Sequence, residues 1–126
     1  MPSHPFPTKE RLKNKKHIAL LFKSGQSMAA FPVLGIYRTD PNPQTAISVA
    51  FTVPKKHFKK AVDRNLIKRR IREAWRLHKN DLVDSLEKHH ISTQIIIIYL
   101  GKEILEFKSI EKGVKKLLRK LKKQIK

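Results

Sequence analysis

The first recurrence of apolar residues along the chain predicts a helix. Ile18, Leu21 and Phe22 are spaced by three and four residues, which places them on one helical face. We expect this helix over about residues 14–23. Gly25 suits its end, because glycine adopts the left-handed conformation that terminates helices at little cost.

Three runs of β-branched and apolar residues predict strands. The first two cover Phe31–Arg38 and Ala46–Val53, with a turn rich in Pro, Asp and Asn over residues 39–43. The third, Gln94–Leu100, is apolar almost throughout, which is typical of a strand buried on both faces.

Two further helices are expected in the second half of the chain. The first covers Ala61–His78, and residues 81–87 either extend it or form a further turn. The second begins near Phe107 and is weakened somewhat by Gly113 inside it. Its apolar stripe at helical spacing consists of Phe107, Ile110, Val114, Leu117, Leu118, Leu121 and Ile125.

The order of these elements, α-β-β-α-β-α, predicts an α+β fold arranged as a two-layer sandwich. The proline-rich residues 1–8 are expected to form a flexible N-terminal arm, and residues 9–126 a single domain. The second strand, the helix after it and the third strand make a β-α-β unit, whose crossover is right-handed by default.

Charge narrows the possible partners. The chain of 126 residues has 29 Lys and Arg against 10 Asp and Glu, a formal net charge of +19. Such an excess repels itself in a compact state and is tolerated where a polyanion neutralises it. Nucleic acid is the first candidate partner and an anionic membrane surface the second, while a merely well-solvated surface would mix the two signs more evenly.

Other classes of site find little support. The chain has no Cys, which excludes disulfides, thiolate metal sites and cysteine nucleophiles. The adjacent His89 and His90 point apart on a regular element and make a poor chelate, so we expect no catalytic residue and no metal site on the protein. The longest apolar run, Ile95–Leu100, is too short to span a bilayer, and we expect a cytoplasmic protein without a membrane partner.

The helix at residues 61–78 separates its cations from its apolar residues. At about 100° per residue, one face collects Ile67, Ile71, Ala74 and Trp75. An adjoining face, which we call the cation face, collects Asn65, Lys68, Arg69, Arg72, Arg76 and Lys79. Neighbouring like charges at this spacing destabilise a helix, and the arginine fork suits phosphate oxygens. The pattern therefore favours contact with a nucleic-acid backbone over a solvated face without a partner.

Two consecutive segments resemble the bacterial ribonuclease P protein family. They are SVAFTVPKK at residues 48–56 and AVDRNLIKRRIRE at residues 61–73. The family pattern is a strand ending near Lys-Lys, followed by A-V-x-R-N-x-x-K-R-x-x-R-E, and every fixed position is present. Length, basicity and the order of elements extend the resemblance over most of residues 9–123.

This resemblance implies an α-β-β-β-α-β-α fold like that of a ribosomal-protein domain, with a left-handed β-α-β crossover against the default. It also implies the role of a non-catalytic protein subunit of an endoribonuclease, ribonuclease P, which removes the 5′ leader of precursor tRNA. The partners would be ribonuclease P RNA, which carries the catalysis with bound Mg²⁺, and precursor tRNA; no obligate protein partner is evident.

The family motif implies which residues contact the catalytic RNA: Arg64, Asn65, Lys68, Arg69, Arg70, Arg72 and Arg76. Helix geometry independently places all of these on the cation face except Arg64 and Arg70, which flank the apolar stripe. Arg64 could instead buttress the helix against an acid or a carbonyl.

The resemblance also implies a cleft for the leader, formed by Ile18, Phe22, Lys55 and Lys56. Phe22 offers a ring that could stack on a base, or it is a plain core residue. Ile18 stands where the family usually has a second aromatic, so only Phe22 keeps a ring at these two positions.

Alternative functions are a ribosomal or other structural RNA-binding protein of similar fold and a non-specific nucleic-acid binder. The last helix also has a cationic outer face, which favours auxiliary RNA contact over a membrane surface. That face consists of Lys112, Lys115, Lys116, Arg119 and Lys123.

Overall fold

The computed structural model describes residues 15–40 and 47–125, and within them a mixed α+β fold. The expected arm at residues 1–8 and residues 41–43 of the expected turn lie outside the described residues. In chain order the elements are α1 (Lys15–Ser24), β1 (Gln26–Ala30), β2 (Val33–Asp40), β3 (Ile47–Thr52), α2 (Ala61–His78), α3 (Asn80–Lys88), β4 (Ser92–Tyr99) and α4 (Phe107–Ile125).

The four strands form one sheet in the order β1-β2-β4-β3. β1 and β2 are antiparallel, as are β2 and β4, whereas β3 and β4 are parallel. β4 is therefore central to the sheet: Ile95 pairs with Tyr37 on one side and with Val49 on the other. The parallel pair joined through helices confirms the expected β-α-β unit, and the left-handed course of its connection stays a prediction.

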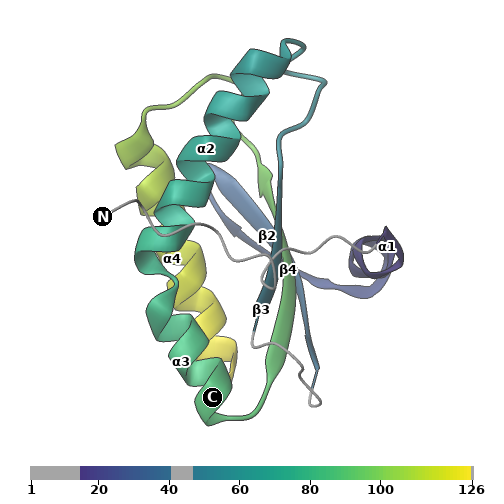
Figure 1. Cartoon of the computed structure of the whole chain (residues 1–126). Coiled ribbons are helices and arrows are strands. Elements are labelled where there is room, and N and C mark those ends of the chain that lie inside the picture. Colours follow the sequence, from purple (N-terminus) through teal and green to yellow (C-terminus); the bar gives the residue numbers. More distant parts are fainter. Residues whose placement is uncertain (1–14, 41–46, 126) are drawn as a thin grey trace.

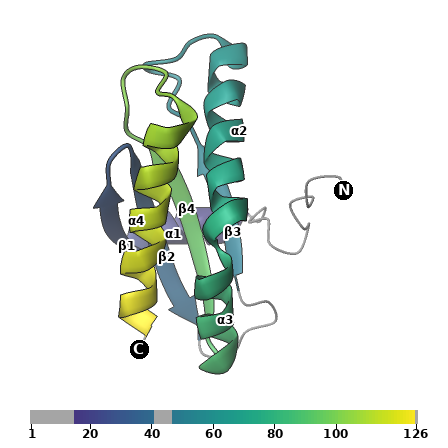
Figure 2. The same ribbon diagram turned by 90° about the vertical axis from the view of Figure 1, so that its left-hand side faces the viewer.

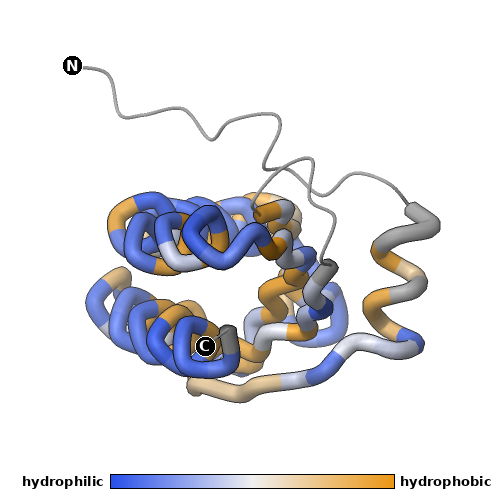
Figure 3. Tube along the Cα trace, turned by 90° about the horizontal axis from the view of Figure 1, so that it is seen from below, coloured by the Kyte–Doolittle hydropathy of each residue, from blue (hydrophilic) through white to orange (hydrophobic). Residues whose placement is uncertain are grey.

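The helices are divided unequally between the two faces of the sheet. α2 and α3 follow each other end to end with α4 beside them, and the three make the main helical layer over one face, whereas α1 lies alone on the other face (Figures 1 and 2). Helical and sheet layers packed in this way confirm the α+β sandwich. A second view along the layers shows apolar positions turned inward between helices and sheet, with hydrophilic positions outward (Figure 3).

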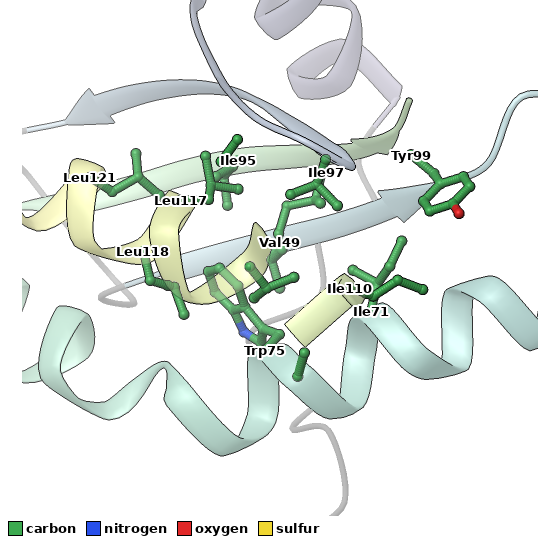
Figure 4. Close-up of a cluster of buried hydrophobic side chains, with 14 of the residues drawn as sticks. Val49, Ile71, Trp75, Ile95, Ile97, Tyr99, Ile110, Leu117, Leu118 and Leu121 are labelled. Carbon is green, nitrogen blue, oxygen red and sulfur yellow. The ribbon is translucent and has the colours of Figure 1, made fainter. Parts of the chain in front are cut away.

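β4 is buried on both of its faces, as its apolar sequence predicts. Ile95 and Ile97 belong to the large core under α2 and α4, whereas Ile96 packs with Leu21 of α1 on the other face. Side chains from the sheet, α2 and α4 meet in the large core (Figure 4), among them Val49, Ile71, Trp75, Ile95, Ile97, Leu117 and Leu118.

The order of elements read from residue patterns alone is wrong by one strand and one helix. It missed β1, a short edge strand whose sequence QSMAA is mostly exposed and lacks β-branched residues. It also left open the status of residues 81–87, which belong to the separate helix α3. The order implied by the family resemblance does contain the additional strand.

β2 begins and ends later than predicted. Phe31 and Pro32 form the turn between β1 and β2, and proline has no N–H to donate to a ladder. At the other end Thr39 and Asp40, expected in a turn, continue the strand by pairing with β4. Pairing with a long central strand therefore overrides the turn propensity of these residues.

Gly113 lies where α4 crosses the β1–β2 hairpin. A Cβ atom at this position would lie 2.6 Å from Pro32 Cδ, 2.8 Å from the Phe31 carbonyl oxygen and 2.9 Å from that of Ala30. Since two of these are backbone atoms, only glycine allows the helix to approach so closely. The residue that weakens the helix by propensity thus makes its packing possible.

Candidate nucleic-acid interface

The two faces predicted for α2 are present in the structure. Ile67, Ile71, Ala74 and Trp75 are its buried residues, which confirms the apolar stripe. The cations beside that stripe differ in how they are held. Those already engaged within the protein have fewer donors to offer a nucleic acid.

Arg72 lies beside an aromatic residue of the neighbouring strand. Its guanidinium carbon is 5.9 Å from the centroid of the Phe51 ring on β3, and that ring packs edge-on against Trp75 at 6.3 Å. A cation–π contact uses the face of the guanidinium and leaves its N–H groups directed away from the ring. The Phe51 ring therefore helps to position Arg72, while the hydrogen-bond donors of Arg72 remain available.

Three other residues of the cation face are less constrained. Within the described residues, Asn65, Lys68 and Arg69 have no hydrogen bond or ion pair. Asn65 and Arg69 are exposed and Lys68 is half-buried. With Arg72 they form a continuous surface of donors that the protein itself leaves open.

Arg76 is engaged within its own helix. It donates two hydrogen bonds to the Glu73 carboxylate, at 2.9 Å from Nε and 2.6 Å from the terminal nitrogen. The hydrogen bond from Arg76 lowers the pKa of Glu73, and the same bond raises the pKa of Arg76. A phosphate at Arg76 would therefore compete with a carboxylate, which is not so at Arg69 or Arg72.

Arg64, the first of the two arginines that flank the apolar stripe, holds the connector between β3 and α2. It donates to the carbonyls of Phe58 and Lys59 at 2.7 and 2.9 Å. Phe58 is buried, with its ring 5.8 Å from that of Tyr99. Buttressing against a carbonyl, one of the two interpretations of Arg64, is thus what the structure shows, and direct RNA contact by Arg64 stays a prediction.

Arg70 holds the loop between β4 and α4 in the same manner. It donates to the carbonyl of Leu105 at 2.6 Å. Tyr99 in the same region donates to the Glu103 carbonyl at 2.6 Å and accepts from the Leu105 N–H at 3.2 Å, and burial raises its pKa. RNA contact by Arg70 likewise stays a prediction.

The residues expected to form the leader cleft occupy two parts of the structure. On α1, Ile18 packs against the small core around Leu21 and Ile96, while Phe22 is 57% exposed. The interpretation of Phe22 as a core residue is therefore wrong. Lys55 and Lys56 are exposed and follow β3, whereas α1 lies over the neighbouring strands β2 and β4.

Features of other kinds of site are missing from the same residues. In the part of the chain that the structure describes, no group of three His, Cys, Asp or Glu side chains could hold a metal ion. No helix among residues 15–40 and 47–125 is long and apolar enough to cross a membrane.

Two features of the interface were missed by sequence reasoning. The contact of Arg72 with Phe51 joins α2 to β3, and only the alternation of residues along β3 hinted at the orientation of that ring. A hollow between α4 and the α2–α3 junction brings together residues far apart in the chain, and its only signal in the sequence was the cationic outer face of the last helix.

Fold and interface together define a small basic α+β protein with a cationic helix face of the kind that suits a nucleic-acid backbone. The ribonuclease P family profile matches residues 6–122, and the chain belongs to this family. Among its relatives, the ribonuclease P protein component of Porphyromonas gingivalis strain W83 is 32% identical over 118 residues, covering 93% of this chain and 86% of the relative.

Solved structures of the family have the same fold. The ribonuclease P protein of Thermotoga maritima matches with a TM-score of 0.68 and 25% identity, covering 88% of this chain and 96% of the other. That of Staphylococcus aureus matches with a TM-score of 0.67 and 23% identity, covering 94% and 93%. The second likeness concerns the fold alone.

Proposed function

We propose that this chain is the protein subunit of a ribonuclease P holoenzyme and assists removal of the 5′ leader from precursor tRNA in the cytoplasm. The family match over residues 6–122 supports the subunit role. The observation that carries the proposal is the cation face of α2, where Lys68, Arg69 and Arg72 lie together without a carboxylate partner among the described residues.

In this proposal the catalytic RNA binds along that face. Lys68, Arg69 and Arg72 neutralise backbone phosphates, and Asn65 adds an amide that can donate to a phosphate or a sugar. Arg76 contributes less, because Glu73 already accepts two of its donors. Arg64 and Arg70 act mainly as positioning residues that fix the loops on either side of the helix.

The chemical step belongs to the RNA and to Mg²⁺ bound by it. The lysines and arginines of the cation face are cationic hydrogen-bond donors and Asn65 is a neutral one, so these side chains stabilise negative charge and position the RNA. The protein's part is therefore to reduce electrostatic repulsion between the catalytic RNA and its RNA substrate.

Contact with the leader is proposed for two places: α1 on its face of the sheet, and the connector that follows β3. The exposed ring of Phe22 is available to stack on an unpaired base, and Lys55 and Lys56 offer charge for the leader backbone. Ile18 packs α1 against the small core around Leu21 and Ile96 and does not supply a second ring.

The test is reconstitution with bacterial ribonuclease P RNA and precursor tRNA at low Mg²⁺, with leader release followed over time. The expected result is cleavage that neither the RNA nor the protein supports alone under these conditions. RNA binding without any rescue of cleavage would contradict the proposal and favour a ribosomal or other structural RNA-binding role.

A further inference from the structure

A second cluster of cations lies on α4, away from the cation face. Lys115, Arg119 and Lys122 follow one another at i, i+4 and i+7, so they form a single stripe on the helix. Within the described residues none of the three has a hydrogen bond or an ion pair. Like charges at this spacing repel each other, which makes the stripe a feature that helix stability alone would not select.

The stripe forms one wall of a hollow of about 230 Å³. The opposite wall comes from the junction of α2 and α3, with His78, Asp81 and Leu82, and Leu118 of α4 completes the lining. Leu82 and Leu118 are buried and give the hollow an apolar floor. In Figure 2 the lower half of α4 runs beside α3, where these walls face each other.

The charges around the hollow favour an anion. Three cations face one carboxylate, that of Asp81. The other nearby acid, Glu111, lies 2.8 Å from His78 Nε2 and so is already paired at the rim. A phosphate group fits the combination of two lysines, which act as point charges, with one arginine fork.

This hollow and the cation face lie on different flanks of α2. His78 projects roughly 130° around the helix from the middle of the cation face. It lies toward α4, as its pairing with Glu111 of α4 shows, whereas Arg72 lies toward β3. One phosphate therefore cannot occupy both, and a partner that reaches both has to pass around the outer surface of the helical layer.

We propose that the hollow between α4 and the α2–α3 junction binds a backbone phosphate of RNA, as a second contact independent of the cation face. This inference rests on the proposed function, because the same holoenzyme supplies the RNA. No Phe, Tyr or Trp lines the hollow, and the ring of His78 is paired with Glu111, so the hollow recognises the phosphate and not a base.

The test uses the double variant Lys115→Gln/Arg119→Gln in the full chain. Its matched control is Lys102→Gln/Lys108→Gln, which removes the same charge from exposed positions outside both the hollow and the cationic outer face of α4. Dissociation constants are measured over a range of salt for ribonuclease P RNA with the free protein, and for precursor tRNA with the reconstituted holoenzyme. The salt slope is the magnitude of the slope of the logarithm of the binding constant against the logarithm of the salt concentration. For at least one of these RNAs, the double variant is expected to lower this slope by about 0.7–0.9, because one phosphate is no longer neutralised. The control is expected to leave the slope unchanged.

Equal slopes for wild type and double variant, or an equal fall for the control, would overturn the inference while leaving the proposed function intact. A wild-type protein that binds neither RNA would overturn both. A titration with inorganic phosphate tests the source of the anion, and chloride at matched ionic strength is the control. Changes in the NMR chemical shifts of backbone amides around Arg119 that saturate with phosphate support an oxyanion site. Such shifts together with unchanged RNA slopes would identify a site for free anions and overturn the RNA assignment.

Discussion

At the scale of single residues, the cations of the family motif divide by their local partners. Arg64 and Arg70 donate to backbone carbonyls of adjoining loops, and Arg76 donates to a carboxylate. Arg72 lies against a ring, and Arg69 has no partner among the described residues. One sequence motif thus contains both side chains that hold neighbouring parts of the protein and side chains whose donors are left available.

Arg72→Ala is expected to weaken binding to ribonuclease P RNA and to lower the salt slope by about 0.7–0.9, because one fewer phosphate is neutralised and fewer counterions are released. The measurement is a series of binding titrations over salt concentration. Lys102→Ala, which removes an exposed cation in the loop after β4, is the control and should leave the slope unchanged. A wild-type slope for Arg72→Ala would contradict pairing of Arg72 with phosphate.

Phe22→Ala is expected to weaken binding of precursor tRNA to the holoenzyme by about 1–3 kcal/mol, the range for loss of one base–aromatic stack. Mature tRNA, which lacks the leader, should bind as before. Because the ring is 57% exposed, unfolding in urea should change little. Phe31→Ala, at another exposed ring in the β1–β2 turn, is the matched control, and equal losses for both tRNAs would rule out leader stacking.

At the scale of elements, side chains of α2 hold two loops. Arg64 holds the connector between β3 and α2, and Arg70 holds the loop between β4 and α4. The connector after β3 is held by buried Phe58 and by the two hydrogen bonds from Arg64. As a result the exposed Lys55 and Lys56 are presented from a short, anchored connector. The orientation of Lys55 and Lys56, the cations that we propose contact the leader, therefore depends on Arg64 of the family motif.

Arg64→Lys keeps the charge, but its ammonium nitrogen ends one bond short of Nη1, the single nitrogen of Arg64 that donates to both carbonyls. We expect it to lower the free energy of unfolding in urea by about 1–3 kcal/mol, since hydrogen bonds to charged groups contribute in that range. The salt slope for RNA binding should be unchanged, because the lysine retains the same charge. Wild-type stability together with weakened RNA binding would instead show that Arg64 contacts RNA directly.

Gly113→Ala tests the close approach of α4 to the β1–β2 hairpin. Alanine favours the helix by up to about 1 kcal/mol, but its Cβ would meet backbone atoms within 3 Å, and such overpacking typically costs about 1–3 kcal/mol. We therefore expect a net loss of stability in urea unfolding. Lys112→Ala, one residue earlier and exposed, reports helix propensity alone, and a stabilised Gly113→Ala would contradict the close contact.

At the scale of the whole molecule, a net charge of +19 is carried by a fold with one large core and one small core. Repulsion among the cations opposes folding, and the stabilisation from burying apolar side chains under α2 and α4 has to exceed this repulsion. Cations on both flanks of the helical layer extend this field over a broad outer surface. Neutralisation by RNA therefore stabilises the fold as well as the complex.

The midpoint of thermal unfolding of the free protein is expected to rise with KCl concentration, because the Debye length falls from about 30 Å at 0.01 M to about 3 Å at 1 M. With a saturating amount of RNA at low salt, the midpoint should already be high. It should then rise less with added KCl than the midpoint of the free protein does. Scanning calorimetry or circular dichroism measures both. A midpoint of the free protein that falls with KCl would show that its internal ion pairs outweigh the repulsion.

Features that depend on local periodicity could be predicted from the amino-acid sequence. The apolar stripes of α2 and α4, the doubly buried β4 and the cation face of α2 all follow from residue spacing, and the structure confirms them. The motif within α2 could be recognised for the same reason, because its residues are close together in the chain and share one helix. The assignment of particular residues to RNA and leader stays a prediction.

Features that depend on contacts between distant segments emerged only in the folded chain. β1 has little strand propensity and exists because β2 pairs with it, and β2 reaches Asp40 because β4 continues alongside. Arg64 and Arg70 bind carbonyls from outside their helix, and the hollow needs both α4 and the α2–α3 junction. Periodicity reports which face of an element is buried, whereas tertiary packing determines which group lies opposite each side chain.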